Sequence, residues 1–284
     1  MEKIIACIDG SALADRVCEL AAWAAKRTDT PIALLHVVAA HTEHAERGDL
    51  SGTIGVDANS QLLTQLTELD EARGKLEQRK GRLILEHAAE QLRADGVAPR
   101  ETLHRRGALV DTVVELEAEA ALIVIGKQGE QADTARGHLG ANLERVARAV
   151  HKPLLVASRD ALPINRFLIA YDGGPSTQKA VDYAAQNPLL RGLHCHLLQI
   201  GDHHGDGPSV HEAASKLTEA GYVVQTAQEH GRHVDEIVAA YCADQGINLL
   251  VIGAYGHTRL RSLILGSTTT ALLRASTIPL LLFR

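Results

Sequence analysis

The residues best placed to do chemistry follow an apolar Val-Ile segment near the end of the chain. Gly253 and Gly256 are separated by two residues, and nine more residues precede Gly266-Ser267, which open a predicted helix. Glycines expose backbone N–H groups to a ligand, and a helix start favours an anion. Arg259 adds positive charge to the loop, and Ser267 is expected to cap the helix. The spacing predicts a phosphate-binding loop; the alternative is that the glycines only shape turns.

A related run occurs in the first half of the chain. It consists of Gly126, Lys127, Gly129, Gly140 and Asn142. Here ten residues rather than nine separate Gly129 from Gly140, and Ala141 stands where the second run has a serine. The missing hydroxyl removes a phosphate partner, for which Lys127 and Asn142 are the residues that could compensate. We therefore expect the first run to be the weaker or altered site.

Each glycine run is accompanied by an aspartate at the end of an opening strand. KIIACIDGS (Lys3–Ser11) and RFLIAYDGG (Arg166–Gly174) match when Asp9 is aligned with Asp172. Asp is common at such junctions because it bonds its own turn backbone. The repetition in register with both glycine runs favours a role in ligand binding instead.

The matches indicate a tandem duplication with halves 1–160 and 161–284, the first carrying an insertion at about 41–76. Short apolar runs alternate with amphipathic stretches, which predicts two tandem doubly wound, Rossmann-like α/β domains with five-stranded parallel sheets. Ligands are expected at the carboxyl ends of the strands.

The predicted strands of the first half are Lys3–Ile8, Pro31–Val38, Glu101–Arg105, Ala121–Ile125 and Pro153–Ala157. Those of the second half are Phe167–Tyr171, His194–Ile200, Val223–Glu229, Leu249–Ile252 and Pro279–Phe283. The predicted helices of the first half are Ala12–Arg27, Glu71–Asp95, Ala108–Glu119 and Leu139–Val150.

The insertion begins with a polar stretch that contains three glycines between Arg47 and Gly55. The leucines that come after it at helical spacing are Leu62, Leu63, Leu66, Leu69 and Leu76. This pattern predicts a loop and then a long amphipathic helix. We expect the helix to cover the sheet or the other half; the alternative is a lid or a partner-docking surface.

Composition narrows the class of protein. The chain has 284 residues, a net charge of −6 and 3% aromatic residues, which disfavours binding to nucleic acid. No apolar run approaches the ~18 residues of a membrane span, and the N-terminus lacks the pattern of a signal peptide. Four unpatterned cysteines are typical of a reducing compartment. We expect a cytoplasmic protein that does not bind membranes.

A metal site is the less favoured interpretation of the histidines. His194 and His196 share a strand face, but no spacing among the fifteen histidines resembles a zinc module. We expect surface or internally bonded histidines, with His36 in a strand, near the end of the sheet. No metal ligand is predicted.

The pattern G-x2-G-x9-G-S after an apolar strand closely resembles the nucleotide loop of the universal stress protein family. The opening strand that ends in Asp-Gly and the closing strand introduced by Pro are also similar to that family. The resemblance covers both halves and implies a tandem universal stress protein of adenine nucleotide alpha hydrolase-like fold. It further implies that the halves pack as a pseudo-dimer, for which Pro153–Ala157 and Pro279–Phe283 are the expected contact strands.

The resemblance also implies the roles of single residues. Asp172 would contact the adenosine part of ATP, and the backbone near Ile200 would lie against adenine. The residues that would hold ribose and phosphates are Gly253, Gly256, Gly266, Ser267 and Thr268. In the first half, Asp9 and Val37 would be the adenosine-side positions of a second site.

Together these features favour a regulatory stress-response protein that binds ATP mainly in its C-terminal half, with Mg²⁺ held by the phosphates. The sequence has no P-loop and no evident general base, so we expect at most slow hydrolysis and predict no catalytic residue. One alternative is a slow ATPase or phosphotransferase. Another is an interaction module that has lost nucleotide binding and holds a protein partner through Arg47–Leu76. Association of two chains is left open.

Overall fold

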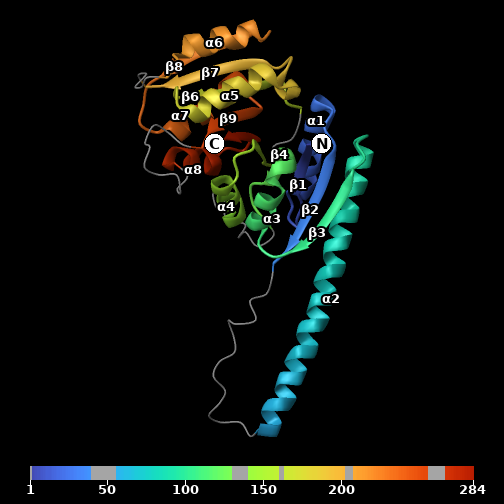
Figure 1. Cartoon of the computed structure of the whole chain (residues 1–284). Helices are drawn as coiled ribbons and strands as arrows, with labels where there is room; N and C mark the ends of the chain where they lie inside the picture. Colours follow the sequence, from blue (N-terminus) through green and yellow to red (C-terminus); the bar gives the residue numbers. More distant parts are fainter. Residues whose placement is uncertain (1, 40–55, 130–139, 160–162, 202–206, 255–265) are drawn as a thin grey trace.

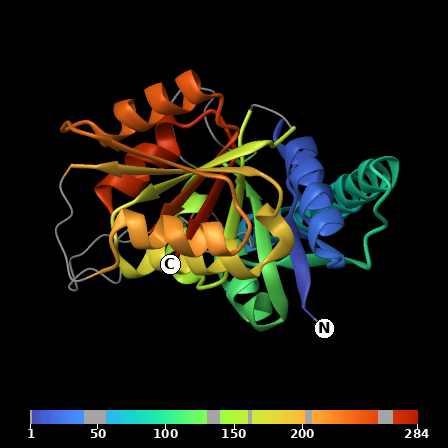
Figure 2. The same cartoon turned by 90° about the horizontal axis from the view of Figure 1, so that it is seen from above.

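The computed structural model describes residues 2–39, 56–129, 140–159, 163–201, 207–254 and 266–284, with side chains of the insertion helix from residue 65 onward (Figure 1). Within these residues, ten strands form one sheet and helices cover both of its faces (Figure 2). The predicted α/β class is confirmed.

The described strands and helices alternate along both halves of the chain. The strands of the first half are β1 (Lys3–Cys7), β2 (Ile32–Val38), β3 (Glu101–Arg106), β4 (Ala120–Gly126) and β5 (Leu154–Ala157). Its helices are α1 (Ala14–Thr28), α2 (Val56–Ala94), α3 (Leu109–Leu116), the 3-10 turn η1 (Glu117–Glu119) and α4 (Ala141–Ala149). The strands of the second half are β6 (Arg166–Tyr171), β7 (His194–Ile200), β8 (Val224–Glu229), β9 (Leu249–Gly253) and β10 (Leu280–Phe283). Its helices are α5 (Pro175–Gln186), the 3-10 turn η2 (Pro188–Leu190), α6 (Val210–Glu219), α7 (Val234–Gln245) and α8 (Ser267–Ala275).

The sheet joins the two halves edge to edge. Its strand order is β3-β2-β1-β4-β5-β10-β9-β6-β7-β8, and every pair within a half is parallel. Among the described strands, β5 and β10 alone pair antiparallel, with Leu281 opposite Leu155. Each of these strands would otherwise leave an unpaired edge. The predicted contact between the two closing strands is confirmed.

Cationic side chains reinforce this seam from both sides. The Lys127 ammonium donates hydrogen bonds to the carbonyl oxygens of Arg274 and Ser276, at 2.8 and 2.6 Å, at the C-terminal end of α8. In the reverse direction, the Arg284 guanidinium donates to the carbonyl oxygen of Arg148 near the end of α4. The last carbonyls of a helix lack intrahelical partners and carry partial negative charge, so cations stabilise them. Each half thus supplies a cation to a helix of the other half.

The core lies on both faces of the sheet because its strands are buried on both sides. Successive residues of one strand, such as Ile4 and Ile5, belong to different apolar clusters. One cluster includes side chains from α1, α2, α5 and α6, and the other includes side chains from α3, α4, α7 and α8. The continuous apolar runs of the sequence therefore indicate strands that are covered by helices on both faces.

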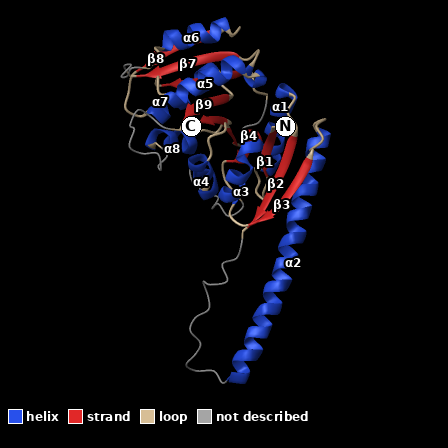
Figure 3. Ribbon diagram, in the orientation of Figure 1, coloured by secondary structure: helices blue, strands red, loops and turns tan. Residues whose placement is uncertain are grey.

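Helix α2 is one continuous helix of 39 residues. The expected helix from Glu71 therefore starts much earlier in the structure and merges with the helical part of the insertion. Its C-terminal part packs on the sheet through Leu85, Ala88, Ala89 and Leu92, which are at most 5% exposed. Its N-terminal part extends away from the body of the molecule (Figure 3). The expectation that this helix covers the sheet is correct only for its last turns.

Gly81 marks the place where α2 meets the sheet. A Cβ atom at this position would lie 2.8 Å from Cδ2 of His36 on β2 and 2.8 Å from Cε1 of His104 on β3. His36 is buried and its Nδ1 lies 2.8 Å from the carbonyl oxygen of Ile8, as expected for an internally bonded strand histidine. A glycine is therefore needed at this contact, whereas Gly74 of the same helix has no atom within 4 Å of a Cβ position.

We expect Gly81→Val to lower the free energy of unfolding by about 1–3 kcal/mol, because the new side chain overpacks against two histidines. Gly74→Val places the same residue in the same helix without a clash, so its effect should stay within about 0.5 kcal/mol. Urea unfolding followed by circular dichroism measures both. Equal losses in the two variants would contradict the close contact at Gly81.

The seam also predicts a pH dependence. Burial, and then the charge of Arg159, lower the pKa of the Lys127 ammonium to about 8. The unfolded chain keeps a pKa near ~10.4 and binds more protons between these values, so stability rises with pH there. From pH ~8 to ~9.5, below the range in which tyrosines ionise, wild-type unfolding free energy should rise more than that of Lys127→Met. Parallel urea-unfolding profiles of the two proteins would refute this assignment.

Candidate functional site

The carboxyl ends of β6 and β9, together with the first turns of α5 and α8, form the predicted site of the second half. Asp172 follows β6, and its Oδ1 accepts hydrogen bonds from the Gly174 N–H at 2.8 Å and from the Thr177 hydroxyl at 2.6 Å. Gly173 between them has a φ of +73°, which favours glycine. One oxygen of Asp172 therefore shapes the turn into α5, while the residue as a whole stays exposed.

The start of α8 has no side-chain cap among the described residues. Its N-cap residue is Gly266, which has no side chain to bond the first turn. Ser267 is the first helical residue, so the expectation that Ser267 caps the helix is wrong. Both Ser267 and Thr268 are exposed. The first N–H groups of a helix have no intrahelical acceptor, and together they form the positive end of the helix dipole.

Thr269 fixes the start of α8 against the end of β9, a role that the sequence did not reveal. Its hydroxyl donates to the carbonyl oxygen of Gly253 at 3.0 Å and also lies 3.3 Å from that of Ala254. The Gly266 N–H points to the same Ala254 carbonyl at 3.4 Å. Thr269 belongs to a Ser-Thr-Thr-Thr run, and sequence alone does not say which hydroxyl faces inward.

Gly253 has a packing role at this point. A Cβ atom there would lie 2.8 Å from Cβ of Ser176 and 3.3 Å from the backbone nitrogen of Thr177. The end of β9 thus approaches the first turn of α5 more closely than a side chain allows. Gly256 and Arg259 lie outside the described residues.

The end of β7 completes this edge of the sheet. Ile200 is half-buried, and Gly201 follows it with a φ of +76° and an N–H that donates to the carbonyl oxygen of Glu229 at 2.8 Å. The segment before α6 is held next to β6, because the Tyr171 hydroxyl donates a hydrogen bond to the carbonyl oxygen of Pro208 at 2.8 Å. Burial and the charge of Asp172 raise the pKa of Tyr171 to about 12, so the hydroxyl remains a donor. Ile200 and Asp172 therefore end neighbouring strands on one edge.

In the first half, the structure brings Asp9 and the glycine run together. Asp9 Oδ1 accepts a hydrogen bond from the Ser11 N–H at 3.0 Å, and a Cβ atom at Gly129 would lie 3.1 Å from Asp9 Oδ2. Gly140, the N-cap of α4, packs on the backbone of residues 127–129, where a Cβ atom would lie 3.2 Å from the Lys127 carbonyl oxygen. The loop, the aspartate and the helix start are therefore in close contact.

The other predicted residues of the first half lie around this contact. Gly126 ends β4, and Val37 is half-buried in β2 beside Arg105. Asn142 is exposed in the first turn of α4. The Lys127 ammonium is not directed at the first turn of α4, because it donates hydrogen bonds to carbonyl oxygens at the end of α8, across the seam. Reaching a phosphate would require breaking both of those hydrogen bonds.

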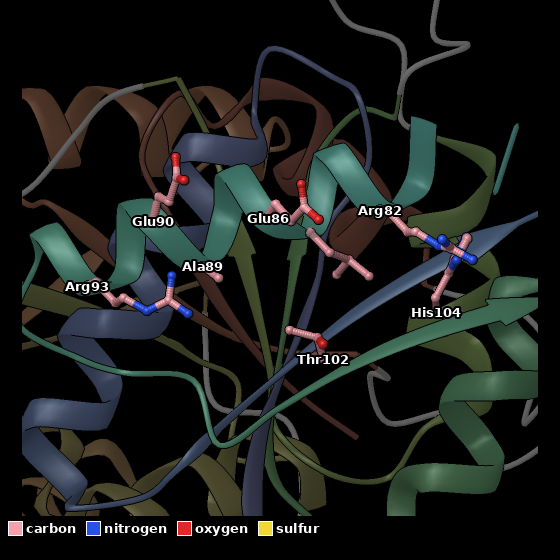
Figure 4. Close-up of a pocket in the computed structure, with 8 residues that line it drawn as sticks. Arg82, Glu86, Ala89, Glu90, Arg93, Thr102 and His104 are labelled. Atoms are coloured by element: carbon pink, nitrogen blue, oxygen red, sulfur yellow. The ribbon is translucent and has the colours of Figure 1, made fainter. Parts of the chain in front are cut away.

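Two cavities are outlined by described residues, and neither is lined by a predicted site residue. A groove of about 510 Å³ runs between α2 and β3, with Thr102 and His104 on its floor and Arg82 close to His104 (Figure 4). Burial, and then the charges of His36 and Arg82, lower the pKa of His104. A second cavity of about 310 Å³ lies between α7 and α8 and is largely apolar. The groove carries two arginines and two glutamates, so it does not select a ligand of one charge.

Other chemistries find little support in the described part of the chain. Burial raises the pKa of all four cysteine thiols, Cys7, Cys18, Cys195 and Cys242, to about 12, which disfavours a nucleophilic thiolate. No group of three or more His, Cys, Asp or Glu residues among the described positions could hold a metal ion. The described helices include none that is long and apolar enough to cross a membrane.

Comparisons with known proteins identify the family to which the chain belongs. The model of the universal stress protein family matches residues 1–158 and again 163–284. A universal stress protein from Synechocystis sp. is 36% identical over 288 residues, which span all of both chains. A second relative, from Mycolicibacterium smegmatis, is 23% identical and covers 99% of this chain and 96% of its own.

A solved structure shows the same fold over the whole chain. The crystal structure of a universal stress protein from Archaeoglobus fulgidus aligns with a TM-score of 0.70 at 20% identity, covering 99% of this chain and 98% of its own. Two matches to one family model, one in each half, account for the internal repeat and for the shared ten-stranded sheet. The chain therefore belongs to the universal stress protein family, as a tandem member with two copies of the family's domain.

Proposed function

We propose that this chain binds ATP, mainly in its second half, and acts as a regulatory stress-response protein. In this proposal residues 1–160 and 161–284 are the two functional units. Mg²⁺ would enter with the nucleotide and be held mainly by its phosphates, whose charge it would neutralise. The Synechocystis relative supports membership of the stress-protein family, and the nucleotide is our own inference.

The start of α8 is the observation that carries the proposal. The cap residue is a glycine, so it offers the first-turn N–H groups no side-chain acceptor, and Ser267 and Thr268 are exposed beside them. Thr269 holds these donors in place from the buried side. Fixed N–H groups at the positive end of a helix dipole fit a phosphate group. Asp172 and Ile200 end neighbouring strands at the same edge, where a ribose and a base would extend from the phosphates.

The two halves differ in ways that favour the second. The first half offers Ala141 where the second offers Ser267, and its cation Lys127 is bonded to α8. Its Gly140 packs directly on the backbone of residues 127–129. A nucleotide in the first half would therefore bind without the serine hydroxyl and without a ready ammonium group.

Turnover is expected to be slow at best. Asp172 is the carboxylate that the proposal places at this site, and one of its oxygens already accepts two hydrogen bonds that shape the turn. A carboxylate held in this way is poorly placed to activate a water molecule. The proposal is therefore one of binding, with hydrolysis as a minor activity.

We expect one adenine nucleotide per chain when the gently purified full-length protein is examined by native mass spectrometry. The second half supplies this site and the first half binds weakly. Two nucleotides per chain would contradict the proposed difference between the halves. No bound nucleotide, together with no heat on adding Mg-ATP in calorimetry, would refute nucleotide binding.

Ser267→Ala should weaken ATP binding roughly tenfold or more, because it removes one charge-assisted hydrogen bond to a phosphate. The matched control is Ser215→Ala, the same substitution at an exposed serine of α6 in the same half, which should leave the affinity unchanged. Calorimetry on the full chain measures both. Gly253 is unsuitable for this test, since a side chain there would collide with Ser176. Equal losses in the two variants would place the nucleotide elsewhere.

A further inference from the structure

The exposed part of α2 carries an apolar stripe. Leu66, Leu69, Leu76 and Leu83 are 48, 66, 66 and 57% exposed, and we call them the leucine stripe. Leu69, Leu76 and Leu83 are seven residues apart, and Leu66 precedes Leu69 by three. This is the a/d spacing of a coiled coil, in which residues seven apart align along one side of a helix. In the sequence the interval extends back to Leu62.

The leucine stripe faces away from the rest of the chain. Leu83 and the buried Leu85 are two residues apart, which places them roughly 200° apart around the helix. Residues 65–73 and 78–80 are all exposed, so this section has little tertiary support. Such an isolated helical section is marginally stable in water without a packing partner. The chain's own residues 40–55 contain only two large aliphatic side chains, Leu50 and Ile54, too few to cover four leucines.

The charges between the leucines specify how a second helix would lie. With the leucines at 69, 76 and 83 as d positions, Leu66, Arg73 and Lys80 are a positions. A parallel pairing of two copies would place Arg73 against Arg73 and Lys80 against Lys80 in the seam. Like charges in direct opposition are unfavourable, so the parallel arrangement is disfavoured.

An antiparallel pairing resolves this conflict. It places Leu66 opposite the partner subunit's Leu83, Lys80 opposite the partner subunit's Leu69, and Arg73 opposite the partner subunit's Leu76. Asp70 and Glu77 directly follow Leu69 and Leu76 at the flanking e positions. Each basic side chain can then cover a leucine with its aliphatic stem and meet a carboxylate with its charged end. The same helix thus supplies both the apolar side chains and the complementary charges.

We propose that the leucine stripe is a dimerisation surface, and that two copies of this chain associate through α2 as an antiparallel coiled coil. The partner is a second copy because the residues at a, d and e positions complement themselves in reverse order. The seam between β5 and β10 is already used within one chain, so α2 provides the surface that joins two chains.

Sedimentation velocity of the full-length protein across the micromolar range tests the dimer. The wild type should sediment as a dimer, and Leu69→Glu/Leu76→Glu should raise the dimer dissociation constant at least about hundredfold, because it places charges inside the seam. The control is Val223→Glu, which changes an apolar residue that is 72% exposed far from α2. Circular dichroism should show that both variants remain folded. A monomeric wild type, or a dimer that survives the double substitution, would overturn the proposal.

Disulfide trapping tests the direction. Chains with Leu66→Cys and chains with Leu83→Cys should form a disulfide-linked dimer when mixed under oxidising conditions, and neither should do so alone. The native cysteines are buried or half-buried, so background cross-linking should be low. Cross-linking of Leu66→Cys with itself would show a parallel pair and overturn the antiparallel arrangement.

Discussion

The antiparallel pairing of β5 with β10 determines how the rest of the molecule is arranged. It converts two five-stranded parallel sheets into one sheet, and it makes the strands of the two halves run in opposite directions. The carboxyl ends of the two sets of strands therefore lie at opposite edges of the sheet. Gly126 and Gly129 lie at one of these edges and Gly253 and Gly266 at the other, and near the seam each half faces the amino ends of the other half's strands. This is why Lys127 meets the C-terminal end of α8.

Helix α8 consequently lies between the two edges. Its N-terminal end belongs to the proposed nucleotide site of the second half, and its C-terminal carbonyls bind the loop cation of the first half. At nine residues the helix is about 13 Å long. The loop of the first half therefore has a structural role, because its lysine, Lys127, stabilises the C-terminal end of α8 in the second half. Two loops that are similar in sequence can therefore differ in the contacts that their side chains make.

The sequence predicts the strands closely and the side-chain contacts poorly, for a physical reason. Runs such as Leu249–Ile252 are apolar on every residue because helices cover both faces, and that signal is local. The roles of Lys127 and Gly253 depend on contacts with residues distant in sequence, which a pattern does not contain. The glycine spacing predicts that Gly253 faces a ligand, but it does not indicate the close packing of this residue on α5. The sequence predicts a helix from the leucines at 62–76 and another over Glu71–Asp95, and in the structure both belong to one continuous helix that runs through Gly74.

Helix α2 also has a mechanical consequence. It is continuous from the sheet to its far end, and its close contact at Gly81 is with β2 and β3, the outer strands of the first half. The part beyond Gly81 is about 37 Å long, whereas the section that packs on the sheet, from Gly81 to Leu92, is about 17 Å long. A tilt of the packed section therefore displaces the far end of the helix more than any other part of it. A tilt of about 5° at Gly81 displaces the far end by about 3 Å, so small movements of the outer strands become large movements at the tip.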